Sequence, residues 1–336
     1  STIFPAVKAV GEELADRIFY LTAKTITATV AKETFALLGK NGYRAKTIQI
    51  TAKEKLCLCD EMECNPVNCP YAKGHFDRVN DAVFDLLCRC DMIERDDILS
   101  QADKYTVCPF ELCLDTASWC DNIICDYNYV FDPNVYLKRF FQEGIKGDYI
   151  FLIDEAHNMV ERSRQMYSAQ IYKEDFLTVK RIMKEHSRSI EKALDRCNKI
   201  LLGMKRECEN YTVYDTLGNM VFSFMRLMTF LDEFLQKANE FPGKKDVMDF
   251  YFELRNFLNI YDLVDEHYVM YSELEADGRF MLKLFCVDPS LNIQKRLDKG
   301  KSAVFFSATL LPVNYYKSLL STKKDNYAIY ADSTFD

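Results

Sequence analysis

Several features are missing from this 336-residue sequence, and each absence narrows the class of protein. No apolar run reaches the roughly 18 residues of a membrane-spanning helix, so no membrane span is predicted. No positively charged start with an apolar core and a small-residue cleavage site indicates export. We find no tandem repeats or low-complexity segments. The formal net charge of −8 provides no overall attraction for nucleic acid. What remains, 49% hydrophobic and 28% charged residues, is typical of an ordinary globular protein.

Cysteine is present in an unusual distribution. Ten of the 13 cysteines lie between Cys57 and Cys125, and the stretch 57–69 reads "CLCDEMECNPVNC". Because nothing indicates secretion, this clustering favours a metal site over a disulfide framework. The thiols alone leave iron–sulfur and zinc open. A zinc site would use Cys57 or Cys59 together with Cys64, Cys69 and His75.

The first part of the chain predicts a parallel α/β sheet. Residues 17–21 and 46–50 read as buried strands, with a helical pattern over 25–40 between them. The α/β rhythm stops at 55–110, which is cysteine-rich and acidic with one expected helix over 77–87. It resumes with a strand in 121–131, a helix over 133–143 and the strand 149–153. Residues 55–110 are therefore interpreted as an insertion in a sheet domain.

A second insertion, predicted to be all α, follows at 168–280. Its apolar residues alternate steps of three and four, which predicts one long helix packed along another. The expected strands 280–287 and 302–306 then return the chain to the sheet domain. The residues of the predicted helical seam are Val179, Met183, His186, Ile190, Ala193, Cys197, Ile200 and Met204. Cys125, in the strand of 121–131, and Cys197, on this seam, are interpreted as core thiols.

The segment 149–157, "YIFLIDEAH", is the most informative of the sequence. Five apolar residues predict a central parallel strand, and Asp154 and Glu155 follow at its carboxyl end, where α/β sheets bind ligands. In P-loop nucleotidases an Asp at this place serves Mg²⁺ and a following Glu positions the attacking water. His157 lies just beyond, where it could couple a nucleotide site to other parts. The alternative is a strand that happens to end in a solvated acidic loop.

A second strand, 302–306, ends in Ser307-Ala308-Thr309. Hydroxyl groups there could bond to a neighbouring carboxylate or histidine. Alone, the segment favours the interpretation of Thr309 as a cap for a helix over 311–320. Together, "DEAH" and a downstream "SAT" at strand ends form the pattern of a superfamily 2 helicase core. The run "YLTAKT" at 20–25 fits a third such segment, in which Lys24 and Thr25 are candidates for contact with the DNA backbone.

With these motifs the sequence resembles the XPD/DinG family of iron–sulfur DNA helicases, and specifically a bacterial DinG-like member. The resemblance covers essentially the whole chain and includes the order of its parts. It implies a RecA-like helicase domain 1 formed by 1–54, 111–167 and 281–336, the last also starting the linker to a second motor domain. It further implies an iron–sulfur domain at 55–110 and a helical Arch domain at 168–280.

The resemblance also implies roles for the cysteines. The last family ligand precedes a proline and an aromatic residue, which matches "CPF" and Cys108. The first follows a "K-x-x-C" run, which matches Cys57, with Cys64 and Cys69 as the middle pair. These four would hold a 4Fe-4S cluster. Cys59 competes for the first position. Because alternate residues of an extended chain point to opposite faces, we expect one of Cys57 and Cys59 not to be a ligand.

A phosphate loop, G-x-x-x-x-G-K-[ST], is missing. The "GKS" at 300–302 does not qualify, because position 295 is lysine and a strand follows. We expect the chain to be a fragment that starts after the phosphate loop and ends before the second motor domain, and that is inactive as an ATPase. The intact protein would use ATP and Mg²⁺ to move 5′ to 3′ on single-stranded DNA. The alternative is a non-catalytic, Zn²⁺-bearing nucleic-acid-binding scaffold with a degenerate motor fold.

The resemblance implies single-stranded DNA and duplex junctions as partners of a monomeric, DNA-associated cytoplasmic motor. Around the cysteines, the mixture of aromatic and basic groups suits stacking and phosphate contact. In the second insertion, basic residues recur every four positions, which indicates either a DNA-binding ridge or a solvated face with Glu185, Glu191 and Asp195 as partners. The candidates near the cysteines are Tyr71, Lys73, His75, Phe76 and Arg78, and those of the ridge are Lys180, Lys184, Arg188, Lys192 and Arg196.

Overall fold

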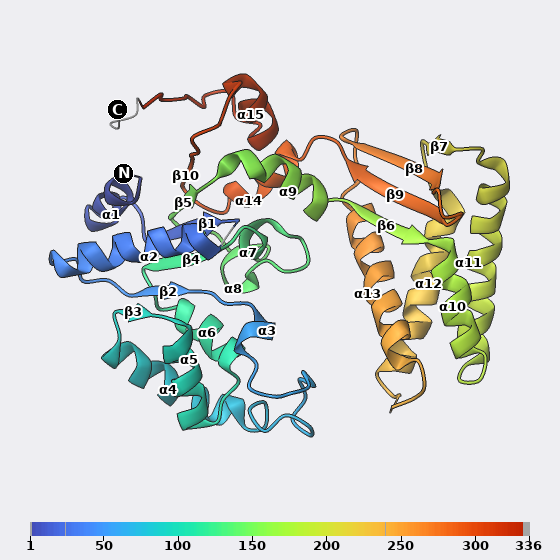
Figure 1. Ribbon diagram of the computed structural model, residues 1–336, viewed down its shortest axis with the longest axis horizontal. Coiled ribbons are helices and arrows are strands. Elements are labelled where there is room, and N and C mark those ends of the chain that lie inside the picture. Colours follow the sequence, from blue (N-terminus) through green and yellow to red (C-terminus); the bar gives the residue numbers. More distant parts are fainter. Residues whose placement is uncertain (1, 24, 239, 332–336) are drawn as a thin grey trace. The chain divides into compact units, whose positions relative to one another are not determined.

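Six short parallel strands form the central sheet of the first of two units into which the chain divides. The computed structural model describes residues 2–23, 25–238 and 240–331 (Figure 1). The first unit comprises residues 1–160 and 292–336, and residues 161–291 form the second. The strand order is β10-β5-β1-β4-β2-β3. The strands are β1 (Arg17–Thr22), β2 (Thr47–Gln49), β3 (Met92–Ile93), β4 (Asn122–Asp126), β5 (Tyr149–Ile153) and β10 (Ser302–Phe305).

This sheet confirms the predicted α/β class. The central strands are buried on both faces, as their continuous apolar runs require. On one face, Ile18 and Tyr20 pack with buried residues of α1 (Ile3–Gly11) and α2 (Thr25–Lys40). On the other face, Phe19 lies 5.1–5.8 Å from the rings of four aromatic residues. Those four are Phe140, Phe141, Tyr149 and Phe151.

The expected helix over 133–143 forms only as α8 (Lys138–Phe141). Asp132 is the physical reason, because its Oδ1 accepts the backbone N–H of Asn134 at 2.8 Å and of Val135 at 3.3 Å. Such side-chain bonds stabilise a turn at the expense of a helix. The preceding α7 (Asn128–Phe131) is equally short.

The cysteine-rich insertion (residues 55–110) is mainly helical and returns to the sheet through β3. The expected helix over 77–87 is confirmed as α4, and α5, β3 and α6 were not predicted. β3 pairs in parallel with β2, which adds the sixth strand. The helices are α3 (Lys53–Leu56), α4 (His75–Arg89), α5 (Arg95–Tyr105) and α6 (Pro109–Ala117).

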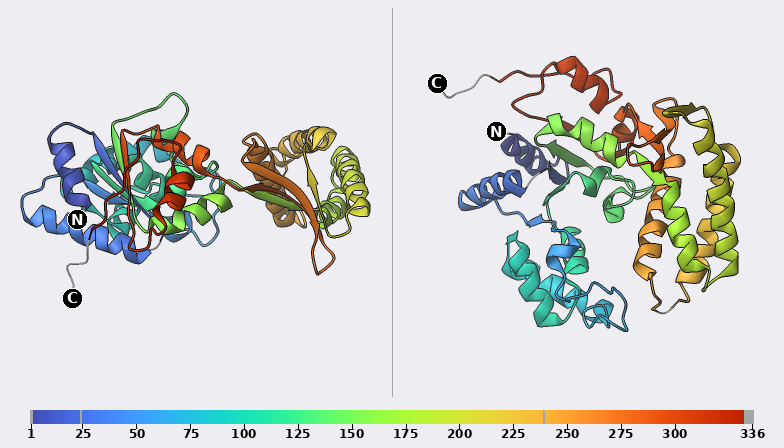
Figure 2. Two further views of the ribbon diagram at one scale, coloured as in Figure 1. Left: turned by 90° about the horizontal axis from the view of Figure 1, so that it is seen from above. Right: turned by 45° about the vertical axis from the view of Figure 1, so that its right-hand side comes forward.

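The described residues of the second unit form a four-stranded antiparallel sheet together with helices (Figure 2). The prediction of an all-α insertion is therefore wrong. The turn "ADG" at 276–278 is a hairpin signal that joins two alternating strands, with Gly278 at φ 82°. The strands are β6 (Ala169–Tyr172), β7 (Tyr211–Tyr214), β8 (Tyr268–Leu274) and β9 (Phe280–Cys286), in the order β6-β9-β8-β7.

The strand expected at 280–287 was assigned to the first sheet, and this too is wrong. It forms β9, which lies between β6 and β8 and hydrogen-bonds to both. The helices of the unit are α10 (Lys173–Met183), α11 (Arg188–Glu207), α12 (Gly218–Leu235) and α13 (Lys244–Tyr261). Stacked and edge-on phenylalanines join three of them, with Phe176 4.9 Å from Phe250 and 5.4 Å from Phe224.

The predicted long helix is also two helices rather than one. The chain turns between α10 and α11, where Ser187 is extended and its hydroxyl accepts the backbone N–H of Ile190. An N-cap serine begins a new helix, and the two then pack against each other. Consequently His186 is exposed, whereas Val179, Met183, Ile190 and Cys197 are buried as predicted.

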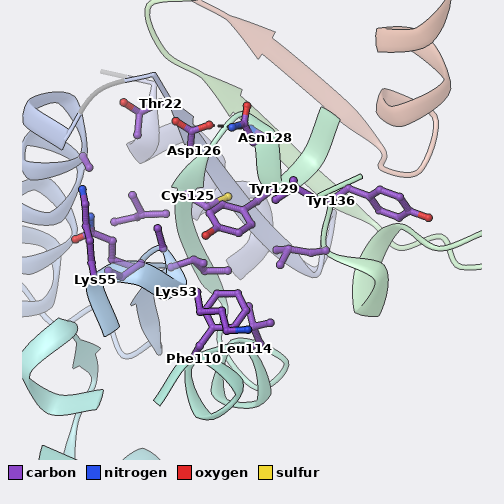
Figure 3. Close-up of a pocket in the computed structure, with 18 of the residues that line it drawn as sticks. Thr22, Lys53, Lys55, Phe110, Leu114, Cys125, Asp126, Asn128, Tyr129 and Tyr136 are labelled. Atoms are coloured by element: carbon purple, nitrogen blue, oxygen red, sulfur yellow. Dashed lines mark hydrogen bonds between the residues drawn. The ribbon is translucent and has the colours of Figure 1, made fainter. Parts of the chain in front are cut away.

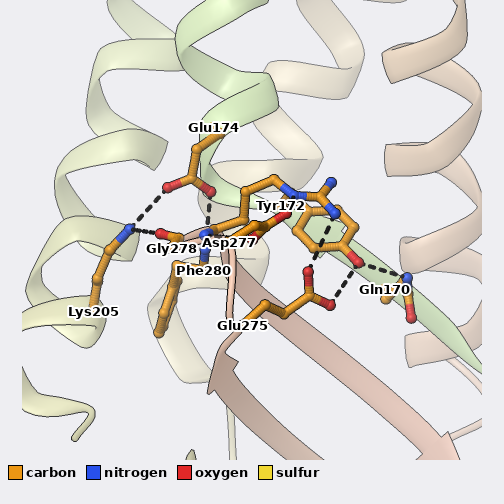
Figure 4. A network of polar contacts seen from close by, with 9 residues as sticks. Gln170, Tyr172, Glu174, Lys205, Glu275, Asp277, Gly278 and Phe280 are labelled. Carbon is orange, nitrogen blue, oxygen red and sulfur yellow. Dashed lines mark hydrogen bonds and ion pairs between the residues drawn. The ribbon is translucent and has the colours of Figure 1, made fainter. Parts of the chain in front are cut away.

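Polar contacts fasten the β8–β9 hairpin to the helices (Figure 4). Glu174 of α10 accepts the backbone N–H of Phe280 at 3.0 Å and lies 3.0 Å from the ammonium of Lys205 in α11. Burial opposes the charge of Glu174, but these donors outweigh it and lower the pKa of its carboxyl. The Lys205 ammonium also donates to the carbonyl of Gly278 at 2.6 Å. Among the described residues of both units, no helix is long and apolar enough to cross a membrane.

Candidate active site

The carboxyl end of β5 delivers Asp154 in a fixed orientation. Its backbone N–H donates to the carbonyl of Leu21 in β1 at 2.9 Å. Its Oδ2 accepts the hydroxyl of Tyr20 at 2.6 Å, and its Oδ1 accepts the backbone N–H of Glu155 at 2.8 Å. The carboxylate is therefore held by one donor on each oxygen, while the residue keeps part of its surface exposed.

A left-handed residue then turns the chain. Glu155 has φ 50° and precedes the short 3-10 helix η1 (Ala156–Asn158). A non-glycine residue in this region is strained, and such strain concentrates at functional sites. The turn aims His157 at the end of the neighbouring strand β10. There His157 Nδ1 lies 2.7 Å from Ser307 Oγ and 3.2 Å from Glu155 Oε2, and the two oxygens lie 3.4 Å apart.

The structure thus brings together the predicted DEAH and SAT segments, which are 150 residues apart in the chain. Ser307 also accepts the backbone N–H of Thr309 at 3.2 Å, and the two hydroxyl oxygens lie 3.4 Å apart. Ala308 lies between them, exposed to solvent. The alternative that Thr309 caps the next helix does not hold, because α15 (Val313–Leu320) begins after Pro312.

Two tyrosines of this site were missed by sequence reasoning. Tyr20 is 4% exposed, and Tyr127, just after β4, donates its hydroxyl to the backbone carbonyl of Asp154. Burial, reinforced by the bond to Asp154, raises the pKa of Tyr20 far above its ordinary value, so the phenol stays a neutral donor. The available signal was a phenol within an apolar strand, since a buried hydroxyl requires a partner.

The five candidate thiols lie in two groups, and all are free. Cys59 Sγ lies 3.8 Å from Cys69 Sγ. Burial raises the pKa of Cys59 to about 11, and the neighbouring thiols of Cys69 and Cys57 contribute to this shift. Cys64 bonds to the ammonium of Lys53, which raises the Lys53 pKa. Burial raises the pKa of the Cys108 thiol, and the nearby thiol of Cys64 raises it further.

Among the residues that the structure describes, no three metal-donor side chains converge on a single point. The chemistry of the donors nevertheless fits an iron–sulfur group, because every candidate is an uncrosslinked thiol that is at least partly accessible. Cys57 ends α3 and Cys108 begins α6, so the predicted first and last ligands lie at helix ends. The pairing of Cys59 with Cys69 keeps Cys59 a competitor of Cys57.

His75, a ligand in the zinc alternative, has other neighbours. It is 4% exposed, its Nδ1 accepts the backbone N–H of Cys108 at 3.2 Å, and its Nε2 lies 3.7 Å from Asp115 Oδ2. This arrangement makes His75 a support for the residue that begins α6. Within the described part of the chain, His75 forms no hydrogen bond to a thiol, and its buried Nε2 has no hydrogen-bond partner.

The candidates for DNA contact have different surroundings. Arg78 donates to the carbonyls of Tyr105 and Lys73 at 2.8 Å and of Thr106 at 2.5 Å, so its guanidinium is committed to the backbone. Lys73 is exposed. Burial, with Asp103 nearby, raises the pKa of the half-exposed Tyr71.

The predicted basic ridge of the second unit is interrupted by the turn between α10 and α11. Lys180 lies on α10 with its ammonium 2.5 Å from Asp195, as the solvated-face interpretation expected. Lys184 and Arg188 are exposed on either side of the turn. In the first unit, Lys24 and the side chain of Thr25 lie outside the described residues.

A cleft of about 860 Å³ opens at the carboxyl ends of β1, β2 and β4 (Figure 3). Its walls include α3 and α6, the helices that carry Cys57 and Cys108 at their ends. Burial raises the pKa of Tyr129 in this cleft, so its phenol is neutral. The lining combines basic groups with aromatic rings: Lys32, Lys53, Lys55, Arg95, Lys138 and Arg139 with Phe110, Tyr129 and Tyr136.

Comparisons with known proteins agree with this arrangement. The DEAD_2 family model matches residues 38–176, which contain the cysteine-rich insertion and the DEAH segment. The chain is 29% identical over 76 residues to the Fanconi anemia group J protein homolog of Gallus gallus, covering 23% of this chain and 6% of that protein. It is 19% identical over 341 residues to the ATP-dependent DNA helicase CHL1 of Candida glabrata, covering 85% of this chain and 40% of that protein. The chain therefore spans less than half the length of either relative.

Two solved structures show the fold. One, described as "XPD_Helicase", has a TM-score of 0.53 at 15% identity over 92% of this chain and 53% of that one. The other, "Truncated XPD", has a TM-score of 0.55 at 15% identity over 95% of this chain and 88% of that one. The chain therefore shares its fold with the two XPD structures, and residues 38–176 match the DEAD_2 family model.

Proposed function

We propose that this chain is part of an ATP-dependent DNA helicase that moves 5′ to 3′ on single-stranded DNA and opens duplex junctions as a monomer. The observation that carries the proposal is the contact of His157 with Ser307, which links the acidic end of β5 to the end of β10. A motor needs such a link, because events at the nucleotide must reach the neighbouring strand. As a DNA motor, the protein would act in the cytoplasm.

The acidic pair suits nucleotide hydrolysis. Asp154 offers a hard carboxylate of fixed orientation, the kind of ligand that Mg²⁺ prefers beside nucleotide phosphates. Glu155 lies next to it with its carboxylate hydrogen-bonded to Ser307, so it can orient a water molecule and take its proton. His157 and Ser307 then relay the state of Glu155 to β10.

The cleft of Figure 3 suits single-stranded nucleic acid. Lys55 and Lys138 line it, and no carboxylate of the described residues forms an ion pair with either ammonium. Cationic groups neutralise phosphates, and aromatic faces stack on bases regardless of their sequence. Tyr129 and Tyr136 supply such faces in the same cleft. Because the overall charge of −8 does not attract nucleic acid, attraction to DNA would come from local basic groups such as those of this lining.

For the cofactor, we propose a 4Fe-4S cluster held by Cys57, Cys64, Cys69 and Cys108, with Cys59 as the competitor for the first position. Such a cluster would connect α3 to α6 and so brace two walls of the cleft. The hydrogen bond that His75 Nδ1 accepts from the backbone N–H of Cys108 favours the cluster over the zinc scaffold.

ATP hydrolysis by the full-length gene product tests the proposal. We expect single-stranded DNA to stimulate it and Glu155→Gln to lower kcat by about a hundredfold or more, because the base that activates water is lost. Binding of a non-hydrolysable ATP analogue should persist. Glu143→Gln, which changes an exposed glutamate on a loop, is the matched control and should leave kcat unchanged.

The isolated 336-residue chain provides a second test. Its sequence contains no phosphate-loop pattern, so we expect it to bind ATP weakly and not to turn it over. A full-length product without DNA-stimulated hydrolysis, or with an unchanged Glu155→Gln variant, would contradict the proposed function.

A further inference from the structure

The orientation of Asp154 depends on Tyr20, a residue to which the sequence analysis gave no role. Tyr20 lies within β1, and its hydroxyl donates to Asp154 Oδ2 at 2.6 Å. The register explains the contact, because Leu21 pairs with Ile153, the last residue of β5, and Asp154 follows it. The backbone bond from Asp154 N–H to Leu21 carbonyl fixes this juxtaposition at 2.9 Å.

The phenol cannot adjust easily to another partner. Tyr20 is 4% exposed, and its ring lies 6.1 Å from the ring of Phe306, the residue before Ser307. Phe306 accepts the N–H of Ala156 on its carbonyl and donates its own N–H to Ile153. The tyrosine is therefore enclosed between the two segments that form the site.

Each oxygen of the carboxylate has a different kind of donor. Oδ1 receives the backbone N–H of Glu155, which moves with the turn, whereas Oδ2 receives the phenol from a separate strand. Without Tyr20 the carboxylate could rotate about its terminal bond, since nothing else among the described contacts holds Oδ2. Tyr127 donates its hydroxyl to the backbone carbonyl of the same residue.

From these contacts we propose that Tyr20 is a positioning residue for divalent-metal binding by Asp154. The inference rests on the proposed function, because it assigns a metal–nucleotide complex to this carboxylate. Outer hydrogen bonds to a metal ligand orient it, and their loss typically lowers metal affinity or activity by about 10- to 100-fold. Tyr20 itself touches neither metal nor nucleotide in this account.

Tyr43 provides a matched control. It is another partly buried tyrosine of the first unit, and its hydroxyl donates to Asn122 Oδ1 at 3.3 Å and accepts the side-chain N–H of the same residue at 3.1 Å. Tyr20→Phe and Tyr43→Phe thus each remove one bonded hydroxyl and keep the ring. Only the first removes a donor from Asp154.

The test measures Mn²⁺ affinity of the full-length gene product by the EPR signal of free Mn²⁺, in the presence of a non-hydrolysable ATP analogue. We expect Tyr20→Phe to weaken Mn²⁺ binding about tenfold and Tyr43→Phe to change it less than about twofold. In ATP hydrolysis, Tyr20→Phe should raise the Mg²⁺ concentration for half-maximal rate more than it changes the KM for ATP.

The outcomes separate the inference from the proposed function. Unchanged Mn²⁺ affinity in Tyr20→Phe overturns the positioning role, even if the wild-type protein hydrolyses ATP. Equal loss in both tyrosine variants also overturns it, because a general loss of packing would then explain the result. A wild-type protein that binds Mn²⁺ tightly, loses it in Tyr20→Phe and hydrolyses no ATP supports the positioning role and contradicts the helicase proposal.

Discussion

At the scale of single residues, Arg78 was predicted to contact DNA, but in the structure it binds backbone carbonyls. From sequence, an arginine among aromatic and basic neighbours predicts phosphate contact. In the structure its guanidinium donates to the carbonyls of Lys73, Tyr105 and Thr106, so it joins the start of α4 to the end of α5. Buried or half-buried carbonyls need donors, and an arginine can satisfy several at once. Its neighbour Lys73 is exposed and remains a candidate for DNA.

This difference predicts opposite effects of two substitutions. Arg78→Gln should lower the free energy of unfolding of the first unit by about 2 kcal/mol, because carbonyl oxygens lose charged donors. Lys73→Gln should change it by less than about 0.5 kcal/mol and weaken binding of single-stranded DNA instead. Urea titration followed by the fluorescence of Trp119, the single tryptophan, measures the first quantity.

Fluorescence anisotropy of a labelled oligonucleotide measures the second. An Arg78→Gln variant of normal stability with reduced DNA affinity would show that Arg78 contacts DNA, and it would contradict the structural role.

Residues with a strong local signature were predictable. Asp154, Glu155 and His157 follow the central strand β5 and Ser307 follows the edge strand β10, and parallel strands bring their carboxyl ends together. Tyr20 was not predictable as a site residue. Whether a strand tyrosine bonds to a carboxylate depends on the register of β1 against β5, which no local pattern contains.

At the scale of elements, helix and strand predictions succeeded where the pattern was long and failed where turns decided the outcome. The strands β1 and β5 and the helix α2 agree with prediction, because each carries a continuous or periodic apolar run. The helical seam broke at Ser187, whose cap begins a second helix with the same periodicity. Of the antiparallel strands of the second unit, β9 was predicted as a strand but assigned to the other sheet. The strands β6, β7 and β8 were missed, although "ADG" between two alternating runs indicated a hairpin.

The cysteine-rich insertion gives a prediction at this scale. Cys57 ends α3 and Cys108 begins α6, so a shared cluster would fasten the two helices to each other. We expect Cys108→Ser in the full-length gene product, purified without oxygen, to lose most of its iron and acid-labile sulfide. The control is Cys88→Ser, which changes an exposed cysteine of α4 and should retain both.

Iron and sulfide analysis together with absorbance near about 400 nm reports the result. Retention of wild-type iron by Cys108→Ser would exclude this ligand. Zinc without sulfide in the wild-type protein would replace the cluster by the zinc alternative.

At the scale of the whole molecule, two units are interleaved in one chain. The second unit, residues 161–291, is inserted between β5 and β10, yet these strands are neighbours in the first sheet. The DEAH and SAT segments therefore meet at the ends of neighbouring parallel strands, although the second unit separates them in the sequence. The order of the parts was predictable from the motifs, whereas the return point at 291/292 was not, since β9 resembles a strand of either sheet.

The most direct test of the central claim is strand separation by the full-length gene product. The substrate is a labelled duplex with a single-stranded 5′ tail, compared with the same duplex carrying a 3′ tail, in the presence of ATP and Mg²⁺. The account predicts that the 5′-tailed duplex is unwound and the 3′-tailed duplex is not. Unwinding of neither duplex, or of the 3′-tailed duplex alone, would contradict it.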